Sequence, residues 1–305
     1  MIDRPALLLI GHGSRSDAGV AEYWRFAEAL QQALPGMLVT GGLIEFAEPE
    51  LDLAIDTLVE RGATSIVAVP LVLLGAGHLK DDGPAALSRA RRRHPQLHLD
   101  YARDLGVHPL VLEVAEERTR KGVESLPHRE HVAVVLVGRG SSDPDANSDL
   151  YKIARLLADR RQLCLAAKTP DDPGARGATR QPDAAPELDN VEPAFVSLAR
   201  PSVTEALERV AQLGAREVAV IPYFLFAGLL VERIGEQARE WADHHKEMTV
   251  AIGDHLGVDR RLVDLVIERY EEARTGGVRM NCDCCVHRVA LPGYEDRLRT
   301  PVPGT

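Results

Sequence analysis

The sequence is short of cysteine, of long apolar runs and of positive charge. Four cysteines among 305 residues are too few for a disulfide scaffold in a chain of this size. No apolar stretch is long enough to span a membrane and the N-terminus lacks a signal-peptide pattern, so we expect a cytoplasmic protein without a membrane partner. The formal net charge of −10 argues against binding to nucleic acid, whose phosphates require a basic surface. An anionic small molecule stays open, because a local basic patch can outweigh the net charge.

An internal repeat is the most informative feature that the sequence does contain. An apolar strand followed by Gly-x-Gly-Ser occurs at residues 7–14 and again at residues 134–141. The offset between the copies grows from 127 at Gly11 and Gly138 to 152 at Pro49 and Pro201, so the second copy holds 25 extra residues. We place them in Lys168–Pro193, which is rich in Pro, Asp and Ala and has no hydrophobic period. This composition predicts a surface loop or a disordered insertion.

Each copy alternates short apolar strands with helical patterns, which is typical of an α/β fold with parallel sheets. In the first copy we expect strands at Leu7–Ile10, Leu38–Phe46, Ser65–Leu73 and Leu97–Tyr101, with helices that include Asp17–Leu34 and Glu50–Arg61. The sequence therefore predicts two doubly wound parallel-sheet domains related by duplication. Their expected bounds are residues 1–125 and 126–275, followed by a cysteine-containing tail at 276–305.

Three side chains that can bind a metal follow three predicted strands of the first copy: His12, Glu45 and His78. Because the carboxyl ends of parallel strands meet at one edge of the sheet, we expect these side chains to converge there. Two imidazoles and a carboxylate suit a divalent ion of the late first row. Glu48, three residues after Glu45, is the competing carboxylate.

A histidine after a strand is more often an ordinary polar residue than a ligand, so the comparison between the two copies matters. In the second copy Arg139, Ser197 and Leu230 stand where the first has His12, Glu45 and His78. The neighbouring glycines and prolines keep their counterparts. Residues needed only for folding would persist in both copies, so this asymmetry indicates a single active site in the first half.

On these residues the first half resembles the sirohydrochlorin chelatases, class II chelatases that insert a metal into a tetrapyrrole without ATP. The whole chain resembles the long, duplicated cobaltochelatases of that family. The resemblance extends over all of the chain except Lys168–Pro193. It implies two α/β domains that face each other, with the macrocycle in the cleft between them and the metal on His12, Glu45 and His78. The segments that carry it are Gly11–Arg15, Glu45–Pro49, Val69–His78, Asp149–Leu157, Pro222–Gly228 and Met280–Cys285.

The resemblance implies sirohydrochlorin as the substrate and Co²⁺ as the metal that is inserted. Fe²⁺, which would make the protein a ferrochelatase of siroheme synthesis, and Ni²⁺ are alternatives, because histidine ligands do not discriminate among these ions. A metal- or tetrapyrrole-binding protein without turnover is an alternative of another class, and the chain is expected as a monomer or a homodimer. The candidate substrate-binding residues are four cations that could pair with the substrate's carboxylates, Arg15, Lys80, Arg139 and Arg200, together with Glu48.

The tail carries three closely spaced cysteines, Cys282, Cys284 and Cys285. In some members of the family a Cys-x-x-Cys pair at this place is associated with an iron–sulfur cluster. One such tail offers too few thiolates for a four-thiolate cluster, unless another cysteine or a second subunit contributes. An iron–sulfur cluster and a free, redox-active or zinc-binding tail are both open.

Overall fold

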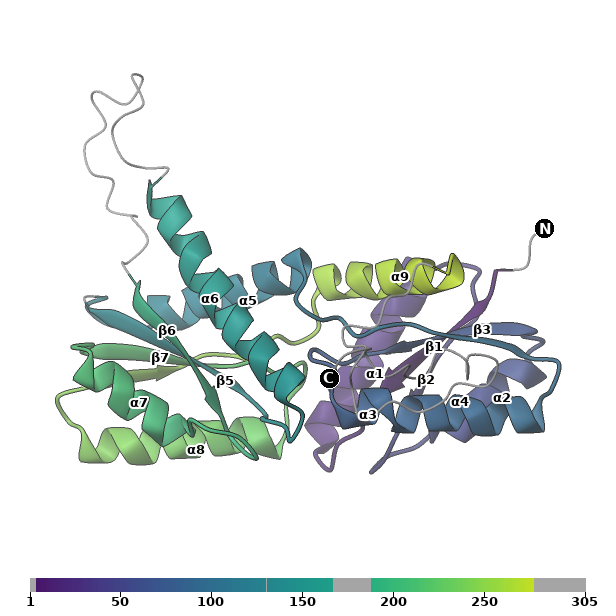
Figure 1. Ribbon diagram of the computed structural model, residues 1–305, viewed down its shortest axis with the longest axis horizontal. Helices are drawn as coiled ribbons and strands as arrows, with labels where there is room; N and C mark the ends of the chain where they lie inside the picture. Colours follow the sequence, from purple (N-terminus) through teal and green to yellow (C-terminus); the bar gives the residue numbers. More distant parts are fainter. Residues whose placement is uncertain (1–3, 130, 167–187, 277–305) are drawn as a thin grey trace, which may run out of the picture. The chain divides into compact units, whose positions relative to one another are not determined.

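The computed structural model describes residues 4–129, 131–166 and 188–276, and the side chains of residues 78–79, 160–166 and 188–189 lie outside the described part. Figure 1 labels most of the helices and strands. The first repeat consists of β1 (Ala6–Gly11), α1 (Asp17–Ala33), β2 (Val39–Leu43), α2 (Leu51–Glu60), β3 (Ser65–Pro70), α3 (Gly77–Lys80), α4 (Asp82–Arg93), β4 (His98–Tyr101) and α5 (Pro109–Glu124). The second consists of β5 (Val132–Gly138), α6 (Pro144–Ala166), β6 (Leu188–Phe195), α7 (Val203–Gln212), β7 (Glu217–Pro222), α8 (Leu229–His244), β8 (Thr249–Ile252) and α9 (Arg260–Arg274).

The strands form two parallel four-stranded sheets with the same topology. Their orders are β2-β1-β3-β4 in the first repeat and β6-β5-β7-β8 in the second. The inner strands β1 and β5 are buried at every residue, as strands with neighbours on both sides and helices on both faces must be. The predicted α/β class and the duplication are therefore confirmed.

Two strands of the first repeat end earlier than their apolar sequence predicts. β2 ends at Leu43 rather than Phe46, and β3 ends at Pro70 rather than Leu73. The apolar residues beyond these ends lie in loops. Leu71 and Leu73 are buried after β3, whereas Phe46 is 50% exposed after β2. Glu45 therefore lies on a loop at the sheet edge, where a side chain can reach a ligand.

The sheet of the first repeat is covered by helices from both ends of the chain. Helices α2 and α4 pack on the face that carries Leu8, Ile10 and Ala68. Helix α1 packs against β2, and α9 packs against α1, β3 and β4 (Figure 1).

The described chain packs as two compact units that exchange the last helix of each repeat. Unit 1 runs to Val111 and also contains Leu225–Leu229 and the chain from Gly257, while unit 2 contains Leu112–Phe224 and Leu230–Leu256. Almost all of α5 therefore belongs to unit 2, and α9 belongs to unit 1. This partition differs from the expected boundary at 125/126. The two helices occupy equivalent places in the element order of the two repeats.

The contacts of Arg269 hold α9 in unit 1. This side chain is 1% exposed, and its guanidinium donates to the main-chain oxygens of Asp104 and Leu105 at 2.9 Å each. It also donates to Glu272 at 3.0 Å. A buried guanidinium requires such partners, because an uncompensated buried charge is strongly unfavourable.

The expected insertion at Lys168–Pro193 is wrong over its last six residues. Leu188–Pro193 form most of β6, and Pro193 lies opposite Leu136 of β5. β6 is an edge strand with β5 as its only neighbour in the sheet. A proline, which has no amide hydrogen, is tolerated there because no strand on the other side needs that hydrogen bond. Residues 168–187 lie outside the described chain. Within the described residues, no helix is both long and apolar enough to cross a membrane.

Candidate metal site

The three predicted metal ligands come from three adjacent loops of unit 1. His12 follows β1, Glu45 follows β2, and His78 lies in α3, which follows β3. β1 is hydrogen-bonded to both β2 and β3, and all three strands are parallel. Their loops therefore leave the same edge of the sheet, as the sequence predicted.

Backbone contacts hold the loops of His12 and Glu45 together. The amide of Glu45 donates to the main-chain oxygen of His12 at 3.0 Å, and the amide of Ile44 donates to that of Gly11 at 3.0 Å. Gly13 has a φ of 93°, and a Cβ atom there would lie 1.7 Å from the main-chain oxygen of Glu45. Only glycine allows this approach. The Gly-His-Gly motif thus brings His12 against the loop of Glu45.

His12 and Glu45 face each other across a distance that suits a shared metal ion. The Nε2 atom of His12 lies 3.4 Å from Oε1 of Glu45, and the two side chains are 32% and 38% exposed. Two ligand atoms that each lie about 2.1 Å from one metal ion at the tetrahedral angle are about 3.4 Å apart. Imidazole nitrogen and carboxylate oxygen both bind divalent first-row ions. The pair therefore fits two positions of one coordination shell.

The third predicted ligand is placed only by its backbone. His78 lies in the four-residue helix α3, and its side chain is outside the described part of the structure. Among the described side chains, no group of three or more His, Cys, Asp or Glu residues could hold a metal ion. The role of His78 as a ligand therefore stays a prediction. Cys282, Cys284 and Cys285 lie outside the described residues, so the cluster also stays a prediction.

The candidate substrate-binding residues of unit 1 differ in exposure. Arg15 is exposed, and its guanidinium carbon lies 4.7 Å from the centre of the Phe46 ring. Glu48 is exposed on the loop after β2. Lys80 is buried, with 7% of its surface exposed. Of the two predicted cations of unit 1, Arg15 is therefore the one that is exposed at the surface.

In unit 2 the two candidate arginines have different surroundings. Arg139 is exposed on the turn after β5. Arg200 lies on the loop after β6 and forms an ion pair with Glu205, through both Nε and Nη2. The hydrogen bond from Arg200 is the main cause that lowers the pKa of Glu205 to about 2. A substrate carboxylate would have to compete with Glu205 for Arg200.

Leu225–Leu229, a segment of the second repeat, belongs to unit 1, which also carries His12 and Glu45. The sequence did not predict this placement. The amide of Ala227 donates to Glu22 of α1 at 2.7 Å. A Cβ atom on Gly19 would lie 2.4 Å from the main-chain oxygen of Ala227, and one on Gly228 would lie 3.7 Å from Oγ of Ser14. Leu225–Leu229 therefore packs beside the turn that carries His12. Its two glycine contacts depend on tertiary packing, for which the sequence carries no local signal.

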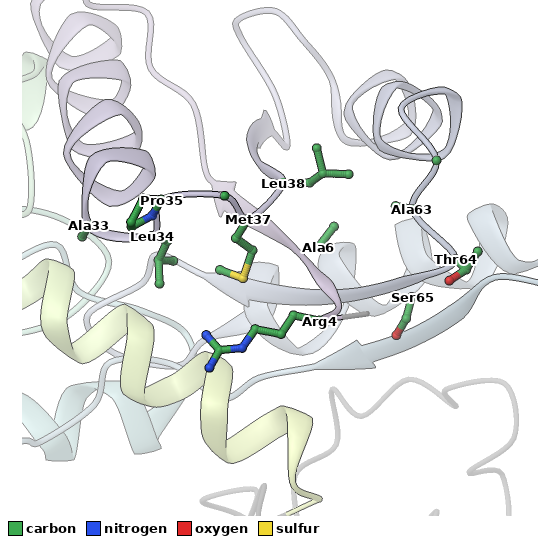
Figure 2. A pocket seen from close by; sticks show the side chains of 12 residues that line it. Arg4, Ala6, Ala33, Leu34, Pro35, Met37, Leu38, Ala63, Thr64 and Ser65 are labelled. Atoms are coloured by element: carbon green, nitrogen blue, oxygen red, sulfur yellow. The ribbon is translucent and has the colours of Figure 1, made fainter. Parts of the chain in front are cut away.

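A hollow of about 490 Å³ lies at the opposite edge of the unit 1 sheet. It is lined by the first residues of β1 and β3, by the last residue of α1 and by the loops that lead into β2 and β3 (Figure 2). Arg4 is the only side chain in its lining that carries a charge. Without a histidine or carboxylate, this hollow offers no ligand set for a divalent ion.

Comparisons with known proteins show the family and the fold of the chain. The CbiX family matches residues 6–122 and 173–273 of the chain. The chain is 34% identical over 293 residues to the sirohydrochlorin cobaltochelatase of Priestia megaterium, covering 95% of this chain and 87% of that protein. It is 27% identical over 269 residues to the sirohydrochlorin ferrochelatase of Bacillus subtilis, covering 88% and 92%.

Two solved structures are similar over nearly their whole length. One is SirB from Bacillus subtilis with Fe³⁺, with a TM-score of 0.69, 26% identity and coverage of 90% of this chain and 97% of that one. The other is the sirohydrochlorin chelatase SirB from Bacillus subtilis subspecies spizizenii in complex with cobalt, with a TM-score of 0.68, 26% identity and coverage of 90% and 96%.

Proposed function

The chain belongs to the CbiX family, and from that premise we propose that it inserts a divalent metal ion into the tetrapyrrole sirohydrochlorin without ATP. The observation that carries the proposal is the 3.4 Å approach of His12 Nε2 to Glu45 Oε1 at the carboxyl edge of a parallel sheet. The similar proteins from Priestia megaterium and Bacillus subtilis support it, because both are named for chelation of sirohydrochlorin.

We propose Co²⁺ as the inserted ion and Fe²⁺ as the second candidate. The similarity to the cobaltochelatase, at 34% identity, favours cobalt. The similarity to two ferrochelatases, at 29% and 27% identity, keeps iron as the alternative. Imidazole and carboxylate bind both ions, so these ligands cannot choose between them.

Insertion requires the metal to lose its water and the macrocycle to lose two pyrrole N–H protons. His12 would hold the incoming ion through a neutral Nε2 atom, with His78 as a further ligand from the next loop. The carboxylate of Glu45 would offset the charge of the ion and accept one of the two protons, and an imidazole or solvent water would accept the other. About a third of each of the two side chains is exposed, although the Nε2 atom of His12 is itself buried. Arg15, Lys80, Arg139 and Arg200 are the proposed partners of the substrate's carboxylates.

The test is metal insertion by the purified protein under anaerobic conditions without ATP. Metal-free sirohydrochlorin is mixed with Co²⁺, Fe²⁺ or Ni²⁺, and insertion is followed by the absorption of the macrocycle. We expect rapid turnover with Co²⁺. His12→Ala and Glu45→Gln should each lower kcat/KM by roughly 10²-fold or more, as loss of a metal ligand or a positioned acid–base group does.

Ser197→Ala is the matched control for Glu45→Gln. Ser197 occupies the position of Glu45 in the second repeat, and its amide makes the equivalent bond to Arg139 at 3.0 Å. This variant should keep wild-type turnover. Stoichiometric binding without repeated release of product would instead identify a metal- or tetrapyrrole-binding protein.

A further inference from the structure

Phe46, directly after Glu45, has an unfavourable backbone conformation and an exposed ring. Its φ is 67°, in the left-handed region that glycine and asparagine tolerate best. Its side chain is 50% exposed, so burial in the core does not compensate for this conformation. A large apolar side chain held in this way is typical of a functional position rather than of a turn optimised for stability.

The second repeat presents an apolar side chain in the same way. Leu198, at the position of Phe46, has a φ of 60° and is 70% exposed. The amide of the preceding residue, Ser197, donates to the main-chain oxygen of Arg139 at 3.0 Å. This hydrogen bond matches the one from the amide of Glu45 to the main-chain oxygen of His12, also at 3.0 Å. The strained loop backbone is therefore common to both repeats. The exposed side chain at this position is aromatic only in the first repeat, where it lies beside His12.

The ring of Phe46 is part of the metal site. Its centre lies 6.3 Å from that of the His12 ring, and the two ring planes differ by 25°. The guanidinium of Arg15 lies over the Phe46 ring, with 4.7 Å between its carbon and the ring centre. A cation over an aromatic face is attracted to it. The site thus combines an exposed aromatic surface, a positioned cation and a metal-ligand pair.

We propose that Phe46 contacts the substrate. Its ring packs against the flat apolar surface of the macrocycle next to the ion held by His12 and Glu45. It also holds Arg15 where the guanidinium can pair with a carboxylate on the macrocycle's rim. This inference rests on the proposed function, because it takes the tetrapyrrole as the ligand. Aromatic contact with a planar ligand is favourable and needs no hydrogen-bond pattern.

The test separates tetrapyrrole binding from metal binding. For wild type, Phe46→Ala and Phe46→Leu, the Kd for metal-free sirohydrochlorin is measured by absorption titration, and the Kd for Co²⁺ alone by calorimetry. Phe46→Ala should raise the Kd and KM for the macrocycle roughly tenfold, and Phe46→Leu should lose less. The Kd for Co²⁺ should stay within about twofold of wild type, since Phe46 supplies no ligand atom.

Two further variants test whether weaker binding comes from the loss of any exposed apolar side chain or from misfolding. Leu53→Ala removes a comparably exposed apolar side chain, 53% exposed on α2, and should leave both dissociation constants unchanged. Phe46→Gly guards against misfolding, because glycine suits the φ of 67°. It should weaken macrocycle binding as much as Phe46→Ala does.

The possible results distinguish this inference from the proposed function. If wild type turns over but Phe46→Ala and Phe46→Gly keep its KM and its Kd for the macrocycle, the inference is overturned and the proposed function stands. If wild type binds sirohydrochlorin without inserting metal while both variants bind it more weakly, the inference is supported and the proposed function fails.

Discussion

Substitution of Gly13 by alanine should disrupt the proposed metal site through the backbone. The added Cβ atom would lie 1.7 Å from the main-chain oxygen of Glu45, and contacts of this kind are essentially never shorter than 3.0 Å. The loops of His12 and Glu45 must therefore separate by about 1.3 Å at this point. Metal-ligand distances tolerate only about 0.2 Å. The 3.4 Å pair of His12 and Glu45 would no longer fit one ion.

The second repeat supplies a matched variant for this substitution. Gly140 has a φ of 84°, and a Cβ atom there would lie 1.9 Å from the main-chain oxygen of Ser197. Alanine at either glycine adds strain of about 1–3 kcal/mol from the positive φ alone, and the close contact adds more. We therefore expect Gly13→Ala and Gly140→Ala to lower the free energy of unfolding by similar amounts.

Only Gly13→Ala should lose metal. We expect its affinity for Co²⁺, measured by calorimetry without tetrapyrrole, to fall roughly 10- to 100-fold, as when other supports of a metal ligand are removed. Gly140→Ala should bind Co²⁺ like wild type, and urea denaturation would show that both variants are folded at the temperature of the titration. Unchanged Co²⁺ affinity in Gly13→Ala, or equal losses in both variants, would refute the reasoning.

Two further predictions concern the stability of the two units. Arg269→Met should lower the free energy of unfolding by roughly 1–3 kcal/mol for each of the two main-chain oxygens, of Asp104 and Leu105, that lose their buried donor. Arg274→Met, on the same helix but 38% exposed, should change it by less than about 0.5 kcal/mol. Equal effects in urea denaturation would contradict the role of Arg269. The pKa of Glu205 is lowered from 4.5 to about 2, mainly by its hydrogen bond with Arg200, so its stabilising effect is present above pH 4.5 and lost as the pH falls towards 2. Glu205→Gln should therefore be less stable than wild type at pH 7, with a difference that shrinks between pH 5 and pH 2; a constant difference would exclude this linkage.

The sequence predicted the fold class and the approach of His12 to Glu45, because both depend on local signals. Strands buried on both faces have uninterrupted apolar runs, and their alternation with helical patterns is typical of parallel sheets. The loss of His12 and Glu45 from the second copy indicated which half carries the candidate metal ligands. Because parallel strands end at a common edge, the sequence also indicated that these two side chains meet.

Other features were decided by packing over long distances in the chain. The exchange of α5 and α9 could not be predicted, because it depends on tertiary contacts such as those of Arg269 with Asp104 and Leu105. The strand at Leu188–Pro193 was missed because an edge position tolerates a proline and needs no strong apolar period.

The sequence by itself determined that the chain is a duplicated α/β protein with one set of candidate metal ligands. The tertiary structure decided how closely those ligands approach and what surrounds them. Phe46 shows the difference, since nothing in its local sequence specifies a φ of 67°. That conformation comes from the backbone bond between Glu45 and His12 and from the contact at Gly13, which form only when the loops after β1 and β2 meet.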